Sequence, residues 1–220
     1  MSSDKSGNTE HRNLNSPISI IDEAFPPVTP TPSQGWTDPV FTAAIVLQDG
    51  TILKGYGLGA AGQTNGELCF NTAMTGYQEI LTDPSYAGQI ITFTFPHVGN
   101  VGTNDEDIER DKLDATSGVR GCVLRASITG PSNYRATQHL NAWLEARGVI
   151  GICGIDTRAL TTIIREKGMP NAIIVHEPTG HFDFEALKAA ARDLPSMEGS
   201  DLAKTVQSGR GLISDEGVWV

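Results

Sequence analysis

The sequence predicts an α/β domain with mixed sheets, and three observations support this. Short apolar runs rich in β-branched residues alternate with segments of helical periodicity. At 220 residues, the chain is long enough to bury a core that supports itself. No internal repeat occurs at the periods of about 20 to 50 residues that are typical of solenoids.

The composition argues against several classes of protein. A net charge of -10 argues against binding to nucleic acid or to an anionic membrane, because both require clustered Lys and Arg. The three cysteines are odd in number and form no C-x-x-C pair, so neither a disulfide framework nor a zinc site is predicted. The sequence has no long apolar run and no signal-peptide pattern, so we expect a cytoplasmic protein.

In residues 1–84, the sequence predicts a tail, then a hairpin and a short helix. Residues 1–39 are rich in Ser, Asn, Pro and Thr, which predicts a disordered tail. From Phe41, two β-rich runs flank Asp49-Gly50, a dipeptide that favours a tight hairpin turn. After the predicted strand "GELCFNTAM", Thr75 and Gln78 have the spacing of a capping box that opens a short helix before Pro84.

Strands and helices then alternate to residue 195. The runs "QIITFTFP", "GVRGCVLRA", "VIGICGI" and "NAIIV" predict strands. A first helix is predicted around Trp143, with Gly148 as its C-terminal cap, and a second begins after Asp156 and stops at Gly168. A last helix runs from Asp183 to Leu194. The segment 196–220 lacks periodicity and is predicted to be a linker.

Two patterns imitate catalytic motifs. Gly57–Gly62 matches G-x-G-x-x-G, but the following residues have no helical periodicity, so we interpret it as a glycine-rich connection between strands. Cys153 lies on a strand-to-helix elbow, yet its apolar neighbours would raise the pKa of its thiol, which favours a structural role. The sequence therefore predicts no catalytic residue.

Other polar side chains were weighed as ligands. His176 and His181 have no ligand spacing, and Asp183 is better explained as a helix cap, so no metal site is predicted. Arg158 and Arg165 lie along one predicted helix, where a solvated face is the default and a role in binding an anion or docking a partner is the alternative.

The segment Phe70–Gln89 is unusually rich in turn and hydrogen-bonding residues. A compact turn-helix-turn explains most of them, with Asp83-Pro84 as its terminator. It does not explain Ser85, whose hydroxyl we expect at a loop surface, where it can bind a polar ligand or a neighbouring domain.

Three stretches taken together resemble a known family: "GELCFNTAMTGYQEILTDPSYAGQIITFTFPHVGNVGTND", "GICGIDTRALTTIIREKG" and "GSDLAKTV". They are similar to the N-terminal domain of the small subunit of glutamine-hydrolysing carbamoyl-phosphate synthase. The resemblance runs from about Thr42 to Trp219. It implies a layered β/β/α domain of the swivelling type at residues 40–195, with helices packed on one side, and an exit linker at 196–220.

The resemblance also implies a function. The complete small subunit hydrolyses glutamine on a C-terminal amidotransferase domain, which the 220 residues do not include. Ammonia then passes to a large subunit, which makes carbamoyl phosphate from bicarbonate and ATP for pyrimidine and arginine synthesis. The serine of "DPSY" helps to bind glutamine, and Ser85 is the matching position. This chain would bind no cofactor, whereas ATP and a divalent metal are expected in the large subunit.

Three hypotheses follow. The first is a docking domain of the synthase small subunit, inactive on glutamine by itself. The second is a stand-alone interaction module that docks the large subunit or a separate amidotransferase. The third, a nucleotide-dependent oxidoreductase, requires a helix that starts near Gly62.

Overall fold

The computed structural model describes residues 39–108 and 118–195. The predicted tail at 1–39, apart from Pro39, and the predicted linker at 196–220 lie outside these residues. The α/β class is confirmed. The strands and helices are, in chain order, β1 (Ala43–Leu47), β2 (Ile52–Gly59), β3 (Gly62–Asn71), α1 (Tyr77–Thr82), the 3₁₀ turn η1 (Pro84–Tyr86), β4 (Gln89–Phe93), β5 (Gly121–Val123), α2 (Leu140–Ala146), β6 (Ile150–Cys153), α3 (Thr157–Lys167), β7 (Asn171–His176) and α4 (Phe184–Arg192).

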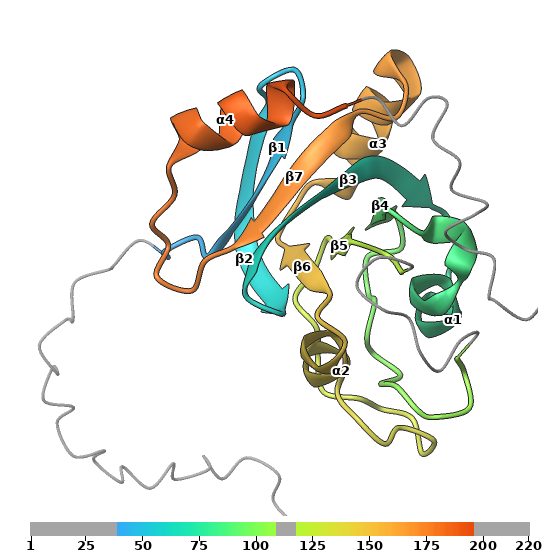
Figure 1. Ribbon diagram of the computed structural model, residues 1–220. Helices are drawn as coiled ribbons and strands as arrows, with labels where there is room; N and C mark the ends of the chain where they lie inside the picture. Colours follow the sequence, from blue (N-terminus) through green and yellow to red (C-terminus); the bar gives the residue numbers. More distant parts are fainter. Residues whose placement is uncertain (1–38, 109–117, 196–220) are drawn as a thin grey trace, which may run out of the picture. The chain divides into compact units, whose positions relative to one another are not determined.

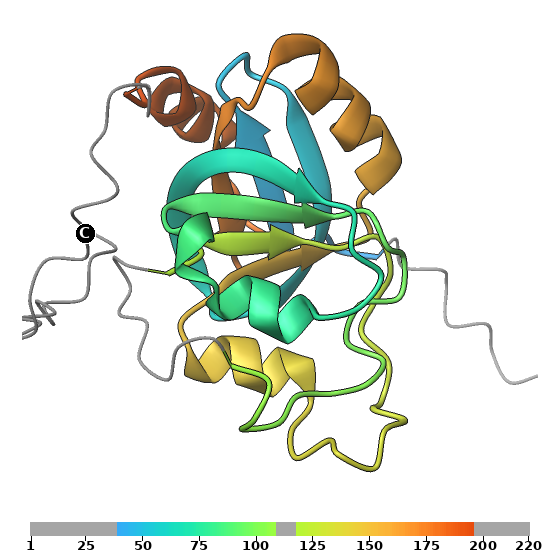
Figure 2. The ribbon, with the colours of Figure 1, turned by 90° about the vertical axis from the view of Figure 1, so that its right-hand side faces the viewer.

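The strands close into one barrel in the order β1-β2-β6-β5-β4-β3-β7. The neighbours β3, β4, β5 and β6 pair in parallel, whereas the other pairs are antiparallel. Figure 2 shows the arrows of β3, β4 and β5 pointing the same way, with α3 toward the end to which they point. The parallel block therefore gives the barrel one edge where several carboxyl ends of strands meet.

The barrel interior is packed with aliphatic side chains from alternate positions of the strands, since successive side chains on a strand point to opposite faces. Ile45, Ile90 and Ile174 are fully buried in this cluster. Helix α3 adds Leu160 and Ile164 to the same cluster. Its predicted apolar face therefore packs against the side chains that fill the barrel.

The outer surface of the barrel carries two further apolar clusters. Leu187 and Ala191 of α4 pack on the outward side of β1 and β7. Helices α1 and α2 share the other cluster, which includes Phe93 and Trp143. Figure 1 shows α4 beside β1 and β7, and α1 and α2 away from it.

The expectation that helices pack on one side is therefore wrong. The outer surface of a closed barrel surrounds it completely. Apolar side chains at two separate places on this surface must therefore be buried by different helices. The layered β/β/α description of the swivelling type is not confirmed by this closed arrangement and stays a prediction.

The predicted turn at Asp49-Gly50 and the predicted caps Asp156 and Asp183 are confirmed. Gly50 has a φ of 87° in the β1–β2 turn, and the Asp49 carboxylate accepts the Thr51 N–H at 2.9 Å. Asp156 caps α3 and Asp183 caps α4 through their carboxylates. No helix among the described residues is both long and apolar enough to cross a bilayer.

Candidate functional site

Ser85 lies in the centre of η1, immediately after α1 and before β4. Its side chain is exposed, as expected from the sequence. The carboxylate of Asp83 accepts the Ser85 backbone N–H at 2.8 Å and so caps the turn, while Pro84 fixes its first residue. The Ser85 hydroxyl forms no hydrogen bond within the described residues, so it is free to meet a group from outside.

The turn is anchored to the strand before it. The Asn71 amide donates to the Tyr86 hydroxyl at 3.0 Å, and its oxygen accepts the Ala73 N–H at 2.7 Å. Asn71 is the last residue of β3, so the residue next to Ser85 is tied to the barrel. Both ends of η1 are thus held in place.

Helix α1 is fixed by Gln78, not by the predicted capping box. Gly76 takes the N-cap position with a φ of 77°, and no side chain caps the helix, so the Thr75–Gln78 capping box is wrong. The Gln78 amide oxygen instead accepts the Asn104 N–H at 3.0 Å, and its amide nitrogen donates to the Asn104 carbonyl. Gln78 is 3% exposed, so this pair is shielded from water.

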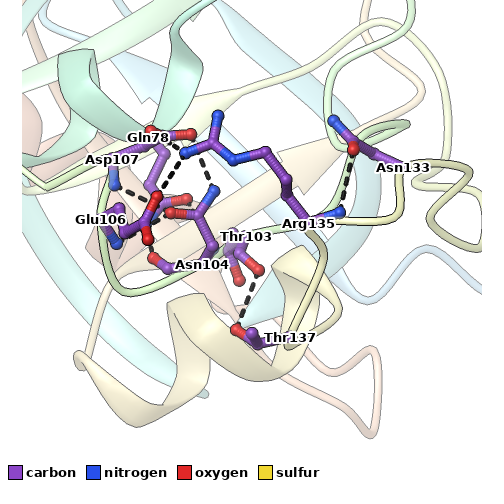
Figure 3. A network of polar contacts seen from close by, with 8 residues as sticks. All are labelled: Gln78, Thr103, Asn104, Glu106, Asp107, Asn133, Arg135 and Thr137. Atoms are coloured by element: carbon purple, nitrogen blue, oxygen red, sulfur yellow. Dashed lines mark hydrogen bonds and ion pairs between the residues drawn. The ribbon is translucent and has the colours of Figure 1, made fainter.

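Asn104 and Arg135 extend these contacts into a polar network (Figure 3). The Asn104 side chain accepts two backbone N–H groups of its own loop and donates to Asp107 at 2.7 Å. The Arg135 guanidinium donates to Glu106 at 2.9 Å and to Asp107 at 3.0 Å. We call Gln78, Asn104, Glu106, Asp107 and Arg135 the Gln78 network; it joins α1 to two long loops, and every polar side chain in it has a partner.

All three cysteines are buried and poor candidates for a nucleophile. Burial raises the pKa of the Cys69 and Cys122 thiols to about 12. Burial also raises the pKa of Cys153, whose sulfur lies 3.9 Å from the Ser127 hydroxyl. The thiolate is the nucleophile, so this burial agrees with the interpretation of Cys153 as structural.

Gly57–Gly62 runs from the last residues of β2 to the first residue of β3, and no helix starts there. This removes the oxidoreductase hypothesis, because a dinucleotide cradle requires a helix N-terminus at that point. Close packing explains why position 57 is a glycine. A Cβ there would lie 1.9 Å from the His176 ring. The Nδ1 of that ring is 3.1 Å from the Ala60 carbonyl oxygen.

His181 contacts the Thr179 hydroxyl at 3.1 Å, and Asp183 serves as a cap, so they form no base–orienter pair. Within residues 39–108 and 118–195, no cluster of three or more His, Cys, Asp or Glu is arranged to hold a metal ion.

The Arg158/Arg165 pair belongs to a larger group than the sequence indicated. Both arginines line a hollow with Arg125, Thr72 and Thr94. The sequence analysis missed the last three, which lie far from α3 along the chain. The signal that could have found them is their position, since each lies in the carboxyl-terminal half of a predicted strand.

Comparison with known proteins gives one consistent result. Residues 45–174 match the family described as carbamoyl-phosphate synthase small chain, CPSase domain. The carbamoyl phosphate synthase small chain of Bradyrhizobium diazoefficiens is 63% identical over 185 residues, which cover 84% of this chain and 47% of that protein. The small chain of Rhizobium meliloti is 60% identical over 193 residues, covering 88% and 48% respectively. The chain thus spans about half the length of the curated relatives it matches.

Proposed function

The chain belongs to the family of carbamoyl-phosphate synthase small chains, and from this premise we propose that it forms the part of a glutamine-hydrolysing synthase that supports glutamine hydrolysis next to an amidotransferase domain. In this proposal, ammonia released from glutamine passes to a large subunit, which makes carbamoyl phosphate from bicarbonate and ATP. The chain's partners are that large subunit and the amidotransferase domain. ATP and the divalent metal belong to the large subunit, and the site of action is the cytoplasm.

The observation that carries this proposal is the Ser85 turn. A hydroxyl that is exposed, free of internal partners and held on a backbone fixed from both sides is suited to positioning a substrate. Ser85 is not suited to attack a substrate, because no base accepts its proton within the described residues. We propose that Ser85 donates a hydrogen bond to glutamine bound mainly by the amidotransferase domain.

The relatives reported above are named as small chains of the synthase, which favours this proposal over a stand-alone interaction module. We also propose that the 220 residues by themselves release no ammonia from glutamine, because their cysteines are buried and protonated at neutral pH. Ammonia release by the purified chain would contradict this.

The test of Ser85 uses the complete small chain assembled with its large chain. Ser85→Ala should raise KM for glutamine roughly fivefold to tenfold, the cost of one hydrogen bond to a polar substrate, with little change in kcat. Synthesis driven by added ammonia should be unchanged, because it bypasses glutamine. Ser132→Ala, at another exposed serine, is the matched control. An unchanged KM in Ser85→Ala would refute the role of Ser85.

A further inference from the structure

A hollow of about 530 Å³ lies at the carboxyl ends of the parallel strands. Thr72 follows β3 and Thr94 follows β4 directly, while Arg125 comes shortly after β5. The segment after β6 is α3, which supplies Arg158 and Arg165. Each of the four parallel strands is therefore followed by residues of the hollow. We call these five residues the arginine hollow; in α/β proteins, ligands bind at this edge of parallel strands.

The arginines of this hollow have little internal compensation for their charge. Arg158 forms no ion pair within the described residues. Arg165 lies over the Phe70 ring, 5.5 Å from its centroid, and likewise has no carboxylate partner among them. Arg125 is 3.9 Å from Asp156, but both side chains are more than half exposed, so this contact is weak. Three cations thus gather on a chain whose net charge is -10.

Hydroxyl groups add neutral donors at the same place. Thr161 and Thr162 also line the hollow, but their hydroxyls already donate to carbonyls of α3. The hydroxyls of Thr72 and Thr94 form no hydrogen bond within the described residues. These two side chains can turn their O–H groups toward a ligand in the hollow.

We propose that the arginine hollow binds a phosphate group. Arginine presents paired N–H donors that match oxyanions, and three guanidiniums with two free hydroxyls offer more donors than the two oxygens of a carboxylate can accept. A phosphate group has three or four oxygens and a charge near -2, so it satisfies more of these donors. Asp156 lies on the Arg125 side and sets the limit of the anion-binding surface there.

This inference does not rest on the proposed function, because Ser85 precedes β4 whereas the hollow lies beyond its carboxyl end. The phosphate can be free or carried on a small molecule. The shared chemistry is the tetrahedral oxyanion, and the two sources are separated by comparing inorganic phosphate with methyl phosphate as a simple phosphomonoester. Tighter binding of the ester indicates a carried phosphate, and equal or weaker binding of the ester indicates the free ion.

The test is a titration of the 220-residue chain with inorganic phosphate at constant low ionic strength, followed by backbone amide NMR shifts. Saturable shifts are expected at the five residues of the hollow, up to about 10 mM phosphate, a range that detects a millimolar Kd. Arg158→Gln and Arg165→Gln should each weaken binding roughly tenfold, because each removes one charged donor from a partly solvated site.

Arg192→Gln is the matched control, an exposed arginine on α4 that should leave phosphate binding unchanged. Unchanged amide spectra away from the substituted residues show that the variants fold. Equal affinity for acetate and phosphate would overturn the proposal, since the hollow would then recognise only the negative charge of a ligand. Absence of saturable shifts would also overturn it. If Arg158→Gln then weakened assembly with the large chain, the arginines would belong to a protein interface.

Discussion

The Gln78 network and the arginine hollow both place arginines at the surface of an acidic chain. They differ in how far nearby carboxylates compensate the positive charge. Arg135 meets two carboxylates, Glu106 and Asp107, at 2.9 and 3.0 Å. Arg158 meets none among the described residues. A paired cation whose partners hold two loops together is explained by structure alone, whereas gathered cations with a weak partner or none among the described residues are available to a ligand. The comparison separates structural polar groups from available ones.

Removing Gln78 is expected to have the largest effect on stability. Gln78→Ala breaks both hydrogen bonds to the Asn104 backbone in a shielded position, so it should lower the free energy of unfolding by about 2–4 kcal/mol in a urea titration. Arg158→Ala, which removes an exposed side chain, should cost at most about 0.5 kcal/mol. Equal losses would erase the distinction between the two regions.

A second comparison uses two buried threonines and smaller effects. The Thr92 hydroxyl on β4 is fully buried and has no partner among the described residues, whereas the Thr82 hydroxyl donates to the Gln78 carbonyl at 2.9 Å. Thr92→Val keeps the shape and removes an unsatisfied polar atom, so it should raise the unfolding free energy by about 1 kcal/mol. Thr82→Val should lower it by a similar amount. A loss of stability in Thr92→Val would show that its hydroxyl has a partner.

The smallest expected effect is on acid stability. The hydrogen bond from Asn104, and then the Arg135 guanidinium, lower the pKa of Asp107 below its ordinary value of 3.8. A carboxyl whose pKa is lowered by folding stabilises the fold above its unfolded pKa, and this contribution is lost as the pH falls through the folded pKa. Asp107→Asn should therefore show a smaller loss of stability between neutral pH and roughly pH 3 than the unsubstituted chain.

Urea midpoints measured across this pH range check that expectation. Arg158→Ala serves as the comparison from the hollow, because Arg158 has no carboxyl partner among the described residues. Its acid dependence should match that of the unsubstituted chain. An Asp107→Asn curve parallel to the unsubstituted one would show that the Asp107 pair is too solvated to matter.

Sequence reasoning correctly predicted features that depend on residues close together along the chain. The caps Asp156 and Asp183 and the Asp49-Gly50 turn depend on residues within a few positions, and the structure contains them as predicted. It failed for Gln78, whose spacing from Thr75 imitates a local cap but whose true partner, Asn104, lies on a distant loop. Barrel closure was missed for the same reason, since strand pairing between distant segments leaves no mark in a window of residues.

The candidate site shows the same division. The exposure of Ser85 could be predicted from its turn, but its assignment to glutamine came only from resemblance and stays a proposal. The arginine hollow was half visible: Arg158 and Arg165 share one helix, whereas Arg125 joins them only because β5 and β6 are neighbours in the barrel.

The position of β1 has a consequence for biosynthesis. This strand lies between β2 and β7, and it pairs with β7 from Ala43↔His176 to Leu47↔Ala172. During translation, the edge of β1 that pairs with β7 stays unpaired until β7, the last strand, has left the ribosome. Such late pairing of distant segments slows folding and leaves an aggregation-prone edge exposed to chaperones on the nascent chain.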